Sequence, residues 1–339
     1  MDDGLTPTLR GTSRPLWQTE LAAAYTRPAE LLAALGIDPA HPALDAERLH
    51  GFPIRVPRSF VARMRPGDVT DPLFLQVWPQ PAEGLEVPGY GVDAVGDLAK
   101  LKGGGLIHKY QGRALAIATG ACAVNCRYCF RRHFPYGDAM AARGQWRETL
   151  AQLDADRSIS EVILSGGDPL ALADDKLAVF AEALEVRPWI RRLRLHTRVP
   201  VVLPSRVDAR LLAWLSASRL QKVIVLHANH GNEIDAGVVA ACAALRRTGA
   251  QLLNQAVLLR AVNDTTDAQA ELSERLIDAG VLPYYLHVLD RVAGAAHFDV
   301  NEDQAQTIMR ELAARLPGYL VPRLVREIAG QPAKTLLPW

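Results

Sequence analysis

The sequence predicts an α/β fold built around a parallel sheet. From residue 113 onward, short apolar runs of strand length alternate with amphipathic stretches of helix length. About six such β–α units follow one another, and this alternation is typical of parallel strands covered by helices. Six units are fewer than a closed eightfold barrel needs, so an open partial barrel and a doubly wound sheet both fit the pattern.

The predicted elements follow in order along the chain. The first strand begins at Arg113 and ends before the break at Gly120, because its apolar run is too short for a helix. Five further strands are predicted at 161–164, 193–196, 222–226, 252–259 and 282–288. Helices are predicted at 174–184, 208–215, 235–247, 266–279 and 302–316.

The part of the chain before the first strand is predicted to be mainly helical. Residues 16–35 have helical spacing with a break at Pro28 and a stop at Gly36. The stretch 84–105 is rich in Gly and Pro and is predicted to be a linker. Shorter helices are expected between these two segments, at 58–64 and 71–77. We therefore expect three regions, which are an N-terminal helical region (1–105), a barrel (106–316) and a C-terminal segment (317–339).

Composition argues against several classes of protein. The chain of 339 residues has 38 Lys and Arg against 37 Asp and Glu, so no excess charge is available to hold nucleic acid or an anionic membrane. No apolar run approaches the length of a membrane span, and the N-terminus does not resemble a signal peptide. Cys242 lies in a helix-like setting and is expected to be a buried small hydrophobe. Unpaired thiols are typical of a reducing cytoplasm.

Three cysteines directly after the first strand are the strongest chemical signal. Cys122, Cys126 and Cys129 form a C-x3-C-x2-C motif. Three thiolates can hold three irons of a [4Fe–4S] cluster, which four cysteines ordinarily hold, and the fourth iron then stays open to a small ligand. A zinc site with His133 as the fourth ligand would have an unusual spacing, and three adjacent free thiols would oxidise. We therefore interpret the motif as an open iron–sulfur site.

Polar residues gather just beyond each predicted strand, where α/β barrels place their active sites. The second strand leads into Ser165, Gly166, Gly167 and Asp168. The two glycines allow the backbone to approach a ligand closely, and Asp168 can accept a hydrogen bond from an ammonium group. Later strands are followed or ended by further polar residues, among them His196, Arg198, His227, Asn229, Gln255, Arg260, His287 and Asp290. This regularity predicts an enzyme.

The cysteine motif, with Tyr128 before its last cysteine and a GGD turn after the next strand, resembles the radical S-adenosylmethionine superfamily. The segments CRYCFRRHFPY, SGGDPL, HANHGNE, NQAVLLRAVND, PYYLHVLD and AKT resemble lysine 2,3-aminomutases, nearest to the short branch that supplies β-lysine for elongation factor P. The resemblance covers essentially the whole chain. It implies a partial (β/α)6 radical-SAM barrel that converts L-α-lysine to β-lysine through a 5′-deoxyadenosyl radical and a pyridoxal phosphate aldimine.

The resemblance also implies cofactor-binding residues. Lys334 falls on the lysine that binds pyridoxal phosphate, although KTLLPW stands here where the family usually has a proline directly after KT. Tyr110, Arg113 and Gln255 match the residues that hold the cofactor phosphate. S-adenosylmethionine would contact His227 and the turn from Ser165 to Asp168.

Substrate-binding residues follow from the same resemblance. Arg131 matches the arginine that grips the lysine carboxylate, and an arginine can do so through two parallel hydrogen bonds. Asp290 and Glu327 match the two acids that hold the ε-ammonium, with Glu327 in the place of the usual aspartate. The longer aminomutases have additional C-terminal cysteines for zinc, and this chain lacks them, so we predict no structural zinc.

Several partners are expected on the same basis. They are free L-lysine, an electron donor such as flavodoxin or ferredoxin, and a functional link to elongation factor P and its β-lysine ligase. A homodimer is plausible by resemblance. Alternative hypotheses are an arginine or glutamate 2,3-aminomutase, a radical enzyme of another reaction type, and a zinc-stabilised interaction module. Glutamate is disfavoured because Asp290 and Glu327 would repel its side chain.

Overall fold

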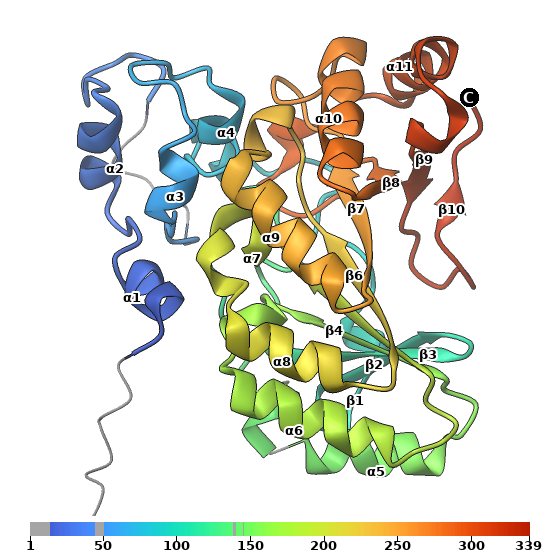
Figure 1. The fold of residues 1–339 in the computed structure, drawn as a ribbon. Helices are drawn as coiled ribbons and strands as arrows, with labels where there is room; N and C mark the ends of the chain where they lie inside the picture. The colour runs from blue at the N-terminus through green and yellow to red at the C-terminus, as the bar shows by residue number, and fades with distance from the viewer. Residues whose placement is uncertain (1–13, 45–50, 138–139, 145) are drawn as a thin grey trace, which may run out of the picture.

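The computed structural model describes residues 14–44, 51–137, 140–144 and 146–339 (Figure 1). Its centre is one ten-stranded sheet, in which every strand neighbours the strand next to it in the chain. Seven consecutive strands run parallel: β3 (Arg113–Thr119), β4 (Glu161–Gly166), β5 (Arg192–Thr197), β6 (Gln221–Leu226), β7 (Gln251–Val257), β8 (Leu282–His287) and β9 (Arg323–Arg326).

Antiparallel strands extend the sheet at both ends. On one side lie β2 (Leu106–Tyr110) and β1 (Leu101–Lys102), and on the other lies β10 (Thr335–Leu336). No strand of the described chain joins β1 to β10, so the sheet stays open. The strand order never reverses, so the sheet has no switch point of the doubly wound kind. The predicted open partial barrel is therefore confirmed over the doubly wound alternative.

Helices cover the outside of the sheet (Figure 1). They are α5 (Arg147–Ala155), α6 (Asp174–Glu185), α7 (Val199–Val202), α8 (Ala209–Ala217), α9 (Ala236–Arg247), α10 (Thr266–Asp278) and α11 (Glu302–Arg315). Polar side chains cap several first turns, as when Asp208 accepts from the backbone of Arg210 and Leu211. The five predicted helices are present, whereas α5 and the four-residue α7 were not predicted.

The sheet has an apolar face toward the helices and a more polar face toward the interior. On β5, Leu193 and Leu195 are buried in the core that the helices share, whereas Arg194 and His196 alternate with them. Because side chains alternate along a strand, Arg194 and His196 point to the opposite, inner face. Cys242 is buried in α9, as predicted. No helix of the described residues is long and apolar enough to span a membrane.

The N-terminal region has short helices. It contains α1 (Leu16–Ala22), α2 (Pro28–Leu35), α3 (Arg58–Val61) and α4 (Pro72–Leu75). The helix α2 ends at Gly36, whose φ of 64° is left-handed, as the sequence predicts. The helices α3 and α4 are shorter than predicted. The linker prediction for 84–105 is wrong at its end, because Leu101 and Lys102 form β1 by pairing with β2.

Candidate active site

The cysteine loop follows β3 directly. Cys122, Cys126 and Cys129 are free and half-buried. Burial and the neighbouring thiols Cys129 and Cys126 raise the pKa of Cys122, and burial and Cys126 raise the pKa of Cys129 to about 11. The three thiols are therefore close enough to affect one another's pKa. The Nε2 atom of His133 lies 3.1 Å from the carbonyl oxygen of Ala293.

The N-terminal region holds this loop in position. The backbone N–H groups of Asn125 and Arg127 donate to the carbonyls of Arg55 and Gln76, at 3.0 and 2.9 Å. The guanidinium of Arg127 is fully buried and donates to Glu83 through Nε at 2.8 Å. A buried charge needs such a partner, because desolvation alone would disfavour it. The cysteine loop therefore depends on residues far away in the sequence.

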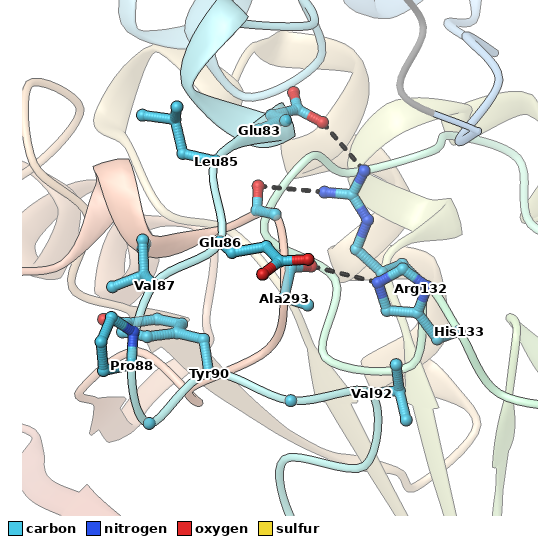
Figure 2. A pocket seen from close by; sticks show the side chains of 15 residues that line it. Glu83, Leu85, Glu86, Val87, Pro88, Tyr90, Val92, Arg132, His133 and Ala293 are labelled. Carbon is cyan, nitrogen blue, oxygen red and sulfur yellow. Dashed lines mark hydrogen bonds and ion pairs between the residues drawn. The ribbon is translucent and has the colours of Figure 1, made fainter.

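Glu83 also pairs with Arg132, whose Nη2 lies 2.9 Å from Oε2 (Figure 2). Arg132 reaches the carbonyl of Gly294 as well, at 3.1 Å. These residues line a pocket of about 600 Å³ between the segment 83–92 and the residues after the cysteine loop. None of the predicted cofactor or substrate residues lines this pocket, so we do not assign it to the reaction.

The glycine turn after β4 packs against the cysteine loop. A Cβ atom on Gly167 would lie 2.4 Å from the carbonyl oxygen of Ala121, and Gly166 has a φ of +121°. Only glycine fits at either place without displacing backbone. Asp168 accepts from the N–H groups of Leu170, Arg198 and Val199 and from the hydroxyl of Thr197. Burial raises the pKa of Asp168 to about 6, although these donors oppose the shift. The carboxylate thus ties the turn to the end of β5, and its contact with S-adenosylmethionine stays a prediction.

Five side chains of alternating charge form a continuous series of ion pairs from Arg131 to Lys334, and we call it the charge row. Arg131 and Asp97 lie 2.8 Å apart, Asp97 and Lys109 2.6 Å, Lys109 and Glu327 3.6 Å, and Glu327 and Lys334 2.7 Å. Asp97 is only 3% exposed. The positive charges of Lys109 and Arg131 hold the pKa of Asp97 below its usual range, against its burial. The carboxylate therefore stays ionised and links the two ends of the row.

The charge row bridges the open seam of the sheet. Lys109 and Tyr110 belong to β2 near one end of the sheet, and Glu327 follows β9 near the other. The hydroxyl of Tyr110 donates to Glu327, and Lys334 precedes β10. Side chains therefore connect the two ends of the sheet where no backbone ladder does. Three predicted site residues (Tyr110, Glu327 and Lys334) meet at this place.

The other residues predicted for pyridoxal phosphate lie close by. The guanidinium of Arg113 stacks over the Tyr110 ring at 4.6 Å. Lys334 Nζ lies 5.9 Å from the centre of the Tyr285 ring, and Gln255 pairs with Tyr285 in the β7–β8 register. Lys334 and Gln255 thus lie beside Tyr285, and Arg113 lies beside Tyr110. Tyr285 was not predicted as a site residue.

Asp290 and two histidines complete the interior. Burial raises the pKa of Asp290 to about 7, with Lys334 lowering it and Glu327 raising it. Burial, with positive charge from Arg194 and Lys334, lowers the pKa of His196, and burial and Lys334 lower that of His287. Both imidazoles are therefore neutral near pH 7. Lys334 affects the pKa of all three groups, so they lie within electrostatic range of this lysine.

His227 packs against Tyr128 of the cysteine loop. Its Nε2 is 3.0 Å from the hydroxyl of Tyr128, and the two rings stack at 5.7 Å. Burial, and then the positive charge of Arg198, lower the pKa of His227 to about 3. The structure therefore places the predicted S-adenosylmethionine residue His227 beside the cysteine loop. Asp97 and Tyr285 were not predicted from the sequence, because contacts between distant segments bring them to the site. His196, Arg198 and His287 were predicted only as polar residues at the strand ends, without a role.

Comparisons with known proteins identify the family. Residues 116–283 match the radical SAM superfamily, and this range includes all three cysteines. The chain is 48% identical to the L-lysine 2,3-aminomutase of Escherichia coli strain K12, over 97% of this chain and 96% of that protein. It is 44% identical to the L-lysine 2,3-aminomutase of Haemophilus influenzae, over 94% of this chain and 95% of that protein.

The chain belongs to the lysine 2,3-aminomutase family. As a radical SAM member of this family, it is implied to use S-adenosylmethionine and a [4Fe–4S] cluster. Among solved structures, a radical SAM methyltransferase from Sphaerobacter thermophilus has a TM-score of 0.46 and 18% identity, over 67% of this chain and 72% of that chain.

Proposed function

We propose that this aminomutase-family protein converts L-lysine to β-lysine by moving the α-amino group to the neighbouring carbon. The observation that carries the proposal is the charge row between Arg131 and Lys334. One end offers a guanidinium for a carboxylate, and the other offers an amine that can bond to a carbonyl cofactor. The names and high identities of the two relatives support the same reaction.

The residues that would hold the radical-forming cofactors surround the cysteine loop. Cys122, Cys126 and Cys129 would ligate three irons of a [4Fe–4S] cluster, since all three are free, lie on the loop after β3 and fall within the residues that match the radical SAM superfamily. S-adenosylmethionine would lie against His227 and the turn at 165–168. The backbone of that turn is open to close approach because Gly166 and Gly167 have no side chains.

Pyridoxal phosphate would lie at the seam of the sheet. Lys334 would bind it covalently, and Tyr110, Arg113 and Gln255 would hold its phosphate, since hydroxyl and guanidinium donors suit a dianion. The cluster with S-adenosylmethionine supplies a carbon radical that takes a hydrogen atom from the substrate, and pyridoxal phosphate supplies an aldehyde that captures amino groups. The protein contributes position and the exclusion of water.

Charged side chains would then select lysine. Arg131 would bind the carboxylate, and its Nη1 is held 3.1 Å from Ser165 Oγ, which fixes its direction. Asp290 and Glu327 would hold the ε-ammonium. Lys334 pairs with Glu327 at 2.7 Å, so this carboxylate can accept an ammonium group.

The proposal also includes the fate of the product, the electron donor, the oligomeric state and the cellular location. The chain matches the two relatives over nearly their full length, which supports the short branch. We propose that β-lysine is destined for elongation factor P through a ligase, that flavodoxin or ferredoxin supplies electrons, and that the enzyme works as a homodimer in a reducing cytoplasm.

The test is an anaerobic assay on iron–sulfur-reconstituted protein with dithionite, S-adenosylmethionine, pyridoxal phosphate and L-lysine. Mass spectrometry after derivatisation should find β-lysine, and not the products of arginine or glutamate run in parallel. Lys334→Ala should abolish both the product and the visible absorption of bound pyridoxal phosphate. Lys222→Ala is the matched control, because Lys222 Nζ donates to the carbonyl of Ser218, away from the charge row. Cleavage of S-adenosylmethionine without any β-amino acid would overturn the aminomutase assignment.

A further inference from the structure

Arg198 lies at the end of β5, directly against the cysteine loop. Its Nη1 is 2.8 Å from the sulfur of Cys126 and also donates to the hydroxyl of Tyr128. The residue is 6% exposed. Its Nε–H is buried and has no acceptor among the residues that the structure describes. A buried guanidinium with a free donor next to a ligand sulfur indicates a role toward whatever the sulfur binds.

Arg198 is held rigidly from the other side. Its Nη2 is 2.9 Å from Glu233 and 2.7 Å from the side-chain oxygen of Gln76. Its backbone N–H donates to Asp168 at 2.7 Å. Glu233 is fully buried and also accepts from the backbone of Asn229 at 2.8 Å. The guanidinium therefore cannot swing away from Cys126 without breaking several buried bonds.

The charges of Arg198 and Glu233 affect how readily a nearby cluster accepts an electron. A cluster gains one negative charge when it is reduced, so a nearby buried cation stabilises the reduced form, and a nearby buried anion destabilises it. An N–H donated to a ligand sulfur acts in the same direction as the cation, because it withdraws electron density from the sulfur. Arg198 touches Cys126 directly, whereas Glu233 lies behind Arg198.

We propose that Arg198 is a positioning residue that raises the reduction potential of the [4Fe–4S] cluster through its bond to the Cys126 sulfur, and that Glu233 limits this rise. The inference rests on the cluster assigned under the proposed function. It concerns how readily the cluster accepts an electron, and it does not depend on which amino acid is the substrate.

The experiment is a redox titration of anaerobically reconstituted protein without S-adenosylmethionine, monitored by electron paramagnetic resonance. Arg198→Gln should shift the midpoint to more negative potential, and Glu233→Gln should shift it to more positive potential. A tenfold change in the ratio of oxidised to reduced cluster corresponds to about 59 mV, and we expect shifts of at least that size. The double variant should return toward the wild-type midpoint.

Arg206→Gln is the matched control. Arg206 is also a fully buried arginine, but its guanidinium bonds to the carbonyl of Leu170 and to Asp174. It should leave the midpoint unchanged. Iron and sulfide content is measured for every protein, so that absence of a cluster in the wild type counts against the proposed function and not against this inference. If Arg198→Gln loads little iron, the midpoint potentials of Arg198→Lys and Glu233→Gln are compared with the wild type instead.

Two results would overturn the inference. One is an unchanged midpoint in fully loaded Arg198 and Glu233 variants, with or without a weaker affinity for S-adenosylmethionine; a weaker affinity would assign Arg198 to the nucleotide instead. The other is a shift of the same sign in both single variants, since opposite charges at these positions require opposite signs.

Discussion

The Nζ atom of Lys334 lies 2.7 Å from Oε2 of Glu327, across the short loop between β9 and β10. Glu327 also accepts from Tyr110 on the far side of the sheet's seam. The pKa of Glu327 is lowered by Lys334 and Tyr110 in spite of its burial. Glu327 is thus ionised and lies beside Lys334, the proposed cofactor lysine.

Glu327→Gln should weaken lysine binding, because the amide removes one of the two anions proposed for the ε-ammonium. Loss of one partner of a largely buried charge pair typically costs 2–5 kcal/mol, so the KM for lysine should rise about thirtyfold or more. Glu327→Asp should recover part of the loss, since it keeps the charge. Glu302→Gln removes a more exposed acid that pairs with Arg326 and should leave KM unchanged. Equal KM values for Glu327→Gln and wild type would exclude Glu327 from the substrate site.

Lysine affinity should depend on pH through Asp290. The pKa of Asp290 is raised to about 7, mainly by burial. The carboxyl is neutral below this pKa and charged above it, and only the charged form attracts an ammonium. Affinity should therefore fall about tenfold per pH unit below pH 7 and level off above it.

Calorimetric titration of lysine into cofactor-loaded protein, from about pH 5.5 to 8.5, measures this dependence. Asp290→Asn should bind lysine weakly at every pH and lose the dependence. The same pH profile in Asp290→Asn and wild type would show that another group titrates.

Asp97→Asn should destabilise the protein. Asp97 is buried between Lys109 and Arg131, and the asparagine would remove the counter-charge of Arg131 and the nearer of the two acids that Lys109 contacts. Breaking a buried pair in this way costs about 3–5 kcal/mol of unfolding free energy. Asp154 is 50% exposed and pairs with Arg187. Asp154→Asn should therefore cost at most about 1 kcal/mol of unfolding free energy. Urea unfolding of the two variants checks the difference, and similar small losses would mean that Asp97 is dispensable.

Gly167→Ala should prevent cluster loading. Its methyl group would lie 2.4 Å from the carbonyl oxygen of Ala121, directly before Cys122, so the loop or the turn must move. Iron content after reconstitution should fall severely while far-ultraviolet circular dichroism stays close to wild type. Gly318→Ala is the control, since no atom lies within 4 Å of the added methyl position. Full iron content in Gly167→Ala would show that the loop adapts.

Local patterns account for the parts of the fold that could be predicted. Strands β3 to β8 are six or seven residues long, with apolar residues either in a short run, as in β6, or in alternation, as in β5. The long helices have apolar periodicity with capping residues such as Asp235. Strands β1 and β10, at the two ends of the sheet next to β2 and β9, have two residues each. Two residues have no periodicity, so pairing with a distant neighbour alone makes them strands.

The sequence by itself determined the cysteine motif, the glycine turn and the order of the β–α units, because these depend on residues within a few positions of one another. Only the tertiary structure decided which charges meet. Tyr110 and Glu327 are 217 positions apart, and Asp97 lies in a segment without any motif. Such contacts form because a buried charge must find a partner, and the closing of the sheet's seam determines which partner is within reach.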